Sequence, residues 1–142
     1  MLDLSTLFDY DLWATRRWMH ALAGFQDLGR AHEILEHILF AQRVWLERLG
    51  VEFEIQTGTE QIQAVFDRLN RKWKQIAEEA NLDARVEYKT SGGAEFVNSV
   101  GEIGLHVVNH GTYHRGQLRG LAESEGWDGF PDTDLILFLR ER

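Results

Sequence analysis

The chain has 142 residues, of which 44% are apolar, and it carries a net charge of −8 at neutral pH. That length and composition indicate one globular domain over residues 1–142 and exclude a disordered chain, while the acidic balance disfavours nucleic acid as a partner. No apolar run is long enough to cross a membrane, and the first residues lack the basic region of a signal peptide, so we expect a cytoplasmic protein with no membrane partner.

The spacing of apolar residues predicts four long helices, two of them in the first third of the chain. The first covers about residues 4–23 and the second about residues 31–49, and each is followed by a glycine that ends it, Gly24 or Gly50. The predicted inward-facing stripes are Leu7, Phe8, Trp18 and Leu22 in the first helix, and Ile34, Leu35, Ile38, Ala41 and Trp45 in the second.

The third helix has the most regular period, because apolar residues recur every three or four positions between Ile62 and Ala77. Thr57 and Glu60 predict a capping box at its start. Alternating apolar residues and a Ser-Gly-Gly turn within residues 86–96 then predict a short β-hairpin.

A second capping-box pattern, Ser99 with Glu102, predicts the start of a fourth helix that continues to about Glu125. An apolar patch at residues 135–139 predicts a tail docked on the helices. We therefore predict an all-α fold, a four-helix bundle with a short β-hairpin before the fourth helix. Because the connection before that helix is long, a crossover there is an alternative to simple up-down-up-down order.

Three of the six histidines, His106, His110 and His114, follow one another at intervals of four in the fourth predicted helix. Residues four apart share a helix face, so two such imidazoles can reach one ion at about 2.0–2.1 Å, although a His pair alone is also typical of a helix surface. His110 and His114 fall in the predicted core-facing stripe, where unsatisfied rings would be costly, and His37 falls in the inward sector of the second helix. Because the chain has no cysteine, we predict a divalent metal ion held by His37, His110 and His114.

His106 is rotated away from that pair, because steps of four residues drift around a helix of 3.6 residues per turn, so we predict a second-shell or packing role for it. Asp11 is either an acceptor for the second N–H of a ligand histidine or a solvated edge residue. Trp45 and Tyr113 are either core residues or walls of a substrate pocket, and Gln117 lies one turn beyond His114, within reach of a hydrogen bond to it. The two remaining histidines, His20 and His32, are predicted to be surface residues.

The segment His-Val-Val-Asn-His-Gly-Thr-Tyr-His-Arg-Gly-Gln at residues 106–117 resembles the signature of the DinB-like (YfiT-type) family of metal-dependent enzymes. Residues 37–45, 7–14 and 134–140 resemble further motifs of that family, although an Asn is more usual where Asp11 stands. The resemblance implies a four-helix bundle with three histidine ligands at His37, His110 and His114. It also implies a homodimer and, by analogy with several members, a transferase that uses a low-molecular-weight thiol.

Three neutral nitrogen ligands leave an ion open to water or to a small-molecule substrate. A helical His-pair peptidase places a Glu directly after its first histidine, where this chain has Gly111, so only Asp11 or Glu33 remains as a base for hydrolysis. A thiol needs less help because its free pKa is about 8.5. We therefore favour S-transfer from a small thiol, with a metal-dependent hydrolase as the runner-up and a non-catalytic metal-binding stress protein as the third alternative. Imidazole ligands suit several metals, of which we expect Zn or Ni.

Overall fold

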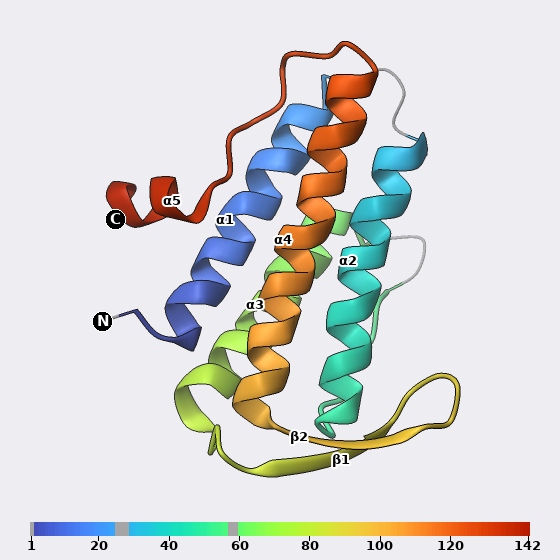
Figure 1. Cartoon of the computed structure of the whole chain (residues 1–142), viewed down its shortest axis with the longest axis vertical. Coiled ribbons are helices and arrows are strands. Elements are labelled where there is room, and N and C mark those ends of the chain that lie inside the picture. Colours follow the sequence, from blue (N-terminus) through green and yellow to red (C-terminus); the bar gives the residue numbers. More distant parts are fainter. Residues whose placement is uncertain (1, 25–28, 57–59) are drawn as a thin grey trace.

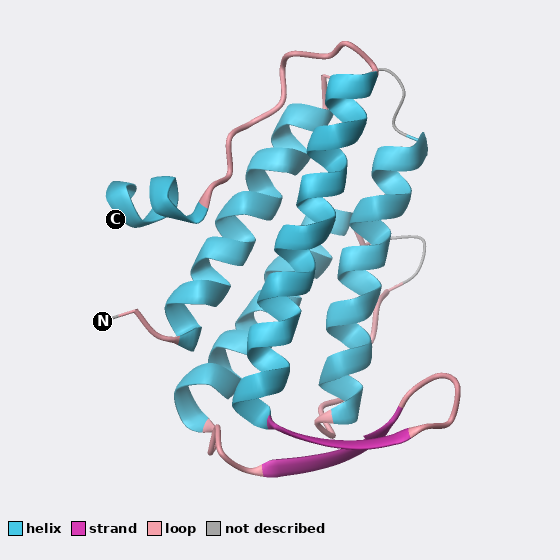
Figure 2. Cartoon of the chain, viewed as in Figure 1, coloured by secondary structure: helices cyan, strands magenta, loops and turns pink. Residues whose placement is uncertain are grey.

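The computed structural model describes residues 2–24, 29–56 and 60–142 of the chain. Its described part is mostly helical, with one antiparallel hairpin before the fourth helix, which confirms the predicted fold class (Figure 2). The elements in chain order are α1 (Leu4–Leu22), α2 (Gly29–Arg48), α3 (Ile62–Glu79), β1 (Arg85–Lys89), β2 (Glu95–Ser99), α4 (Val100–Ser124) and α5 (Leu135–Glu141). None of the helices in these ranges combines the length and apolar character that crossing a membrane requires.

The four long helices form a bundle in which α1 packs mainly against α3, and α2 packs mainly against α4. Figure 1 shows that α1 and α4 run in one direction while α2 and α3 run in the other. The chain therefore crosses between opposite ends of the bundle in the connection from α2 to α3, and not before α4 as the long predicted loop suggested. The reason is that β1 and β2 pair antiparallel, from Arg85 with Ser99 to Lys89 with Glu95, so the hairpin returns the chain to the end it left.

The core lies between the facing apolar stripes of these helices. The predicted period of α3 places Val65, Phe66, Leu69 and Trp73 in the interior. The ring of Trp73 stacks on Phe8 of α1 with ring centroids 5.2 Å apart. Large buried side chains thus hold α1 against α3, while α2 packs against α4, the pair that carries the predicted metal ligands.

The two predicted capping boxes have different outcomes. At the start of α4, the Glu102 backbone N–H donates to Ser99 Oγ at 3.1 Å, and the Ser99 N–H donates to Glu102 Oε2 at 2.8 Å, which confirms that box. At the start of α3, Thr57 lies outside the described residues. The helix begins after Gln61, and Glu60 accepts hydrogen bonds from Arg68 instead of capping the helix.

The predicted tail docks on α1 as the short helix α5. The ring of Phe138 lies 5.9 Å from that of Tyr10 and 5.6 Å from that of Trp13. Tyr10 Oη donates to the Thr133 carbonyl oxygen at 2.8 Å, and Trp13 Nε1 donates to Glu141 at 3.2 Å. Through these contacts, part of the predicted apolar patch packs against α1 of the same chain, while Ile136 stays exposed.

Candidate metal centre

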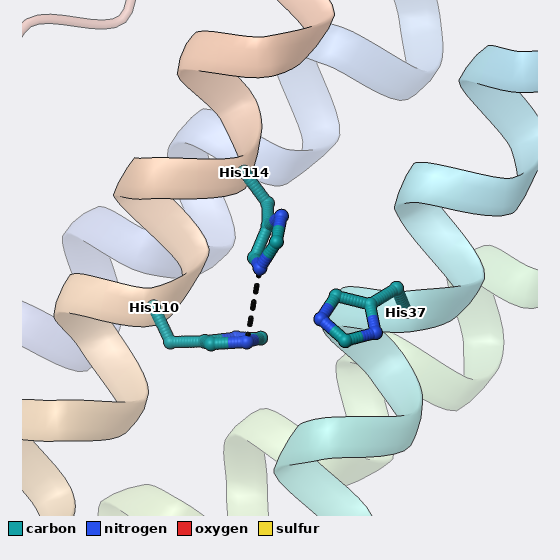
Figure 3. Close-up of side chains that lie close together, drawn as sticks. All are labelled: His37, His110 and His114. Carbon is teal, nitrogen blue, oxygen red and sulfur yellow. Dashed lines mark hydrogen bonds between the residues drawn. The ribbon is translucent and has the colours of Figure 1, made fainter.

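Three histidines from two antiparallel helices meet in the groove between α2 and α4 (Figure 3). His110 Nε2 and His114 Nε2 lie 3.0 Å apart, and the ring centroid of His37 lies 5.0 Å and 4.4 Å from those of His110 and His114. One possible ligand atom from each residue lies within 4.8 Å of those of the other two. The predicted residues thus form one cluster, built from the four-residue spacing on α4 and the packing of α2 against it.

The cluster lies at the rim of the bundle, whereas the sequence pattern placed its histidines in the core. His37 is exposed, and His110 and His114 are half-buried. The buried positions of α4 are instead Ile103, Val107, Gly111, Arg115 and Leu118, together with four others at the same face: Val100, Gly104, Val108 and Ala122. Because each helical residue is rotated by about 100° from the previous one, a core stripe through Gly111 and Arg115 leaves His110 and His114 at its edge.

Gln117 fixes the orientation of one predicted ligand. Its side-chain oxygen Oε1 lies 2.6 Å from His114 Nδ1. Because an amide oxygen only accepts, Nδ1 must carry the proton, and the lone pair of His114 then lies on Nε2, which points to His110. A histidine ligand is commonly oriented in this way by a partner on its other ring nitrogen, so the contact fits metal binding.

The electrostatic environment lowers the pKa of two of the three histidines. Burial, followed by repulsion from His114, His37 and His106, lowers the pKa of His110 to about 4. Burial also lowers the pKa of His37, and the charges of His114 and Arg30 contribute to that shift. Metal ligation requires neutral imidazole, so both residues are in the required form at neutral pH. Three convergent imidazole nitrogens fit a borderline-soft divalent ion such as Zn or Ni.

His106 does not join the three-residue cluster. Its ring centroid is 5.7 Å from that of His110, and its ring meets Trp45 edge to face at 5.1 Å. Burial, and then the charge of Arg48, lower the pKa of His106. The residue thus lies between the three-histidine cluster and Trp45.

Asp11 is buried but contacts no ligand histidine. Its carboxylate accepts a hydrogen bond from Arg115 Nη1 at 2.7 Å and one from Gln42 Nε2 at 2.9 Å. The expectation that it is either a histidine acceptor or a solvated edge residue is therefore wrong. No local sequence pattern indicates this pair, because Arg115 and Asp11 are 104 positions apart.

The two aromatic residues proposed as pocket walls lie on different sides of the cluster. Tyr113 meets the ring of His114 edge to face at 5.0 Å and is itself exposed. Trp45 lies beyond His106 and contacts Tyr88 of β1, with ring centroids 5.0 Å apart. Neither residue closes the cluster from solvent. His32, predicted to be a surface residue, is exposed and pairs with Glu36, and His20 is exposed as well.

A cavity of about 300 Å³ opens beside the cluster, on the side of the groove toward the start of α2. Its lining residues are Arg30, Glu33, Ile34, His37, His114 and Gln117. Arg30 was not predicted as a site residue, although it lies seven positions before His37, two turns away on the same helix. Its guanidinium donates to Glu33 at 3.0 Å. The cavity thus offers a substrate both a cation and a carboxylate next to two of the histidines.

Comparison with known proteins relates the chain to one family. The model of the DinB family matches residues 1–128. Protein DinB of Bacillus subtilis (strain 168) is 26% identical over an alignment of 161 positions. The alignment covers 94% of this chain and 92% of that protein. No solved structure shows a significant match.

Proposed function

The chain belongs to the DinB family, and we propose that it is a metal-dependent enzyme that transfers a low-molecular-weight thiol to an electrophilic small molecule. The observation that carries the proposal is the open cluster of His37, His110 and His114 beside a cavity of about 300 Å³. Structural metal sites are usually closed by four protein ligands, whereas a catalytic site keeps a position for the substrate. An exposed three-histidine cluster therefore favours an enzyme over a non-catalytic metal-binding stress protein.

The absence of cysteine determines where the sulfur comes from. No residue of the chain can supply a thiol, so the nucleophile is a thiol from solution. A divalent ion, when bound, would favour the thiolate form of a thiol at neutral pH. The residues of this chain have separate tasks: the three histidines hold the ion, and Gln117 keeps His114 in the tautomer that ligation requires.

The overall reaction is a substitution in which the thiol proton is released to solvent. The sulfur then donates an electron pair to an electrophilic carbon, and a carbon–sulfur bond forms. The bond from that carbon to its leaving group breaks, and the leaving group departs with its electron pair. With an aryl chloride as the electrophile, thiol and aryl chloride give the aryl thioether, chloride and a proton, and no oxidant or reductant is needed.

Hydrolysis is a second candidate because one carboxylate does lie beside the cluster. Glu33 lines the cavity together with His37 and His114. Asp11, the other base considered from the sequence, is buried against Arg115 and cannot serve a water at this groove. A metal-dependent hydrolase would therefore rely on Glu33 as its general base, whereas a thiol, which is far more acidic than water, depends on that carboxylate less.

The test is to load the protein with Zn or Ni and to follow free thiol and ester cleavage in parallel. Glutathione, bacillithiol, mycothiol and coenzyme A are each offered with an aryl chloride. We expect thiol loss for at least one of them with the wild type and with His32→Ala, and no loss above background with His114→Ala. Equal thiol loss for wild type and His114→Ala would overturn the transferase. Ester cleavage that disappears in Glu33→Gln would establish the hydrolase instead.

We also propose that the protein is a homodimer, as the family resemblance implies. Phe138 of the tail packs against Tyr10 and Trp13 of its own chain, so the apolar residue of the tail most available to a partner is Ile136, which is 50% exposed. Sedimentation at micromolar concentration is expected to give the mass of two chains. A monomer at that concentration would overturn the proposal.

A further inference from the structure

Arg48, the last residue of α2, is held by aromatic rings and not by a carboxylate. Its guanidinium carbon lies 4.3 Å from the ring centroid of Trp45 and 5.3 Å from that of Tyr88. In residues 2–24, 29–56 and 60–142, no carboxylate lies within ion-pair distance of it. Arg43, one turn earlier on α2, shows the contrast, since it pairs with Glu47 at 3.2 Å.

The aromatic group that holds Arg48 continues to the histidine cluster. Trp45 meets Tyr88 and His106 edge to face, at 5.0 Å and 5.1 Å between centroids. His106 in turn lies 5.7 Å from His110. A row of rings therefore joins the predicted metal ligands to Arg48. Figure 1 shows that the hairpin lies at the end of the bundle where α2 ends and α4 begins.

The hairpin fixes one side of this row. Tyr88 of β1 donates a hydrogen bond from Oη to Asn98 Oδ1 at 2.6 Å, and Asn98 is also bonded to Glu102 of α4. Because the hydroxyl is anchored, the ring of Tyr88 is held where it meets the guanidinium. The position of Arg48 is thus set by residues from three elements, α2, β1 and, through Asn98, β2.

The chemistry of this arrangement is suited to an anion. These ring contacts give the guanidinium no acceptor for its N–H donors, which can therefore bind a carboxylate or phosphate through two oxygens. A planar group already held by rings loses little side-chain entropy when it binds. The chain as a whole carries a net charge of −8. An arginine without a carboxylate partner beside the site is therefore a local positive charge on an acidic protein, and it would attract an anion.

We propose that Arg48 binds the carboxylate or phosphate group of an organic substrate whose apolar or aromatic body lies along Trp45, Tyr88 and His106. The inference deepens the proposed function, on which it rests, by naming the substrate class: an anion with an apolar or aromatic body. The cavity on the other side of the cluster, with Arg30 and Glu33, then remains for the second reactant.

Binding of small probes tests this without any turnover. Benzoate and phenyl phosphate are titrated into the zinc-loaded protein, with neutral benzamide as the isosteric control, and affinity is measured by calorimetry. We expect at least one anion to bind the wild type about tenfold more tightly than benzamide, in line with a charge-assisted pair. Arg48→Gln is expected to lose that difference, Arg48→Lys to keep part of it, and Arg43→Gln to keep all of it. The preferred anion shows whether the natural group is a carboxylate or a phosphate.

A second arm uses metal-free protein, because a carboxylate can also bind an ion directly. Binding that persists without metal and is lost in Arg48→Gln supports the inference. Binding that requires metal and is unchanged in Arg48→Gln would overturn it, as would equal affinity of all three probes for the wild type. These outcomes are distinct from failure of the proposed function, in which no thiol is consumed although the anion still binds at Arg48.

Discussion

Arg115 of α4 donates a hydrogen bond of 2.7 Å to Asp11 of α1, and both side chains are buried directly behind the face of α4 that carries the histidines. The same carboxylate accepts a hydrogen bond from Gln42 of α2, and Arg115 also donates to Thr15 and Thr112. One polar network therefore ties α1 to the two helices, α2 and α4, that carry the candidate metal centre.

Removing either charge of this pair is expected to destabilise the fold. Asp11→Leu leaves the Arg115 charge buried and uncompensated, and Arg115→Met does the same for Asp11, at a cost of about 3–5 kcal/mol each. Because an apolar pair of similar volume needs no partner, the double variant is expected to lose less than either single variant. Urea unfolding of the four proteins measures this coupling.

The control for this prediction is an exposed pair. Arg16 and Asp67 interact at 2.8 Å, and their side chains are 50% and 26% exposed, so Arg16→Met is expected to cost at most about 1 kcal/mol. If Arg115→Met and Arg16→Met lower stability equally, the buried network does not hold the helices together.

Because Gly111 has no side chain, it leaves room for the buried pair of Asp11 and Arg115. A Cβ at that position would lie 2.5 Å from Asp11 Oδ1 and 2.9 Å from Arg115 Nη1. Gly111→Ala is therefore expected to destabilise the protein by about 1–3 kcal/mol, although alanine is the better helix former. The free energy of unfolding from urea titrations checks this.

Gly116 provides a matched control on the same helix, because a Cβ there would meet nothing within 4 Å. Gly116→Ala is expected to stabilise the protein by about 0.5–1 kcal/mol, through lower backbone entropy in the unfolded chain. Stabilisation by both substitutions would show that Gly111 is not required by the buried pair.

The capping box of α4 is the third feature with a clear expected effect. Ser99→Ala removes the hydroxyl that accepts the Glu102 N–H and is expected to cost about 1 kcal/mol in thermal or urea unfolding. An unchanged stability would show that the box does not contribute.

The same capping box predicts how the stability of the folded protein changes with pH. The Ser99 backbone N–H, followed by the Asn98 side chain, lowers the pKa of Glu102 below its ordinary value. The carboxylate therefore stabilises the folded state above its ordinary pKa, and this contribution is lost as the pH falls through the lowered value. The difference in stability between wild type and Glu102→Ala should accordingly shrink on acidification.

Features that depend on neighbouring residues in the chain could be predicted from the sequence. The Ser99–Glu102 box, the helix periods and the four-residue spacing of His110 and His114 are local, and the structure has each of them. The choice of His37 as the third histidine needed one further assumption, that the second and fourth helices pack together, which they do.

Features that depend on long-range pairing could not be predicted. Arginine is mostly exposed in proteins, so nothing in the local pattern marks Arg115 as a core residue until Asp11 is placed beside it. The core stripe predicted for the fourth helix therefore included His110 and His114, whereas the structure buries the neighbouring residues Gly111 and Arg115. Likewise, Arg48 becomes notable only once the hairpin brings Tyr88 against it.

The metal centre itself gives the last prediction. Purified protein loaded with zinc is expected to contain one ion per chain, measured by mass spectrometry of the metal. His37→Ala, His110→Ala and His114→Ala each remove one of three convergent nitrogens and should lose the ion.

His106→Ala should keep the ion, since His106 lies outside the cluster. Its metal affinity should fall by at most about 10–100-fold, the range for a residue that only supports a ligand. His32→Ala, on the exposed face of α2, is the control and should bind as the wild type does. Full metal content in His110→Ala would disprove the ligand set, and complete loss in His106→Ala would make His106 a ligand.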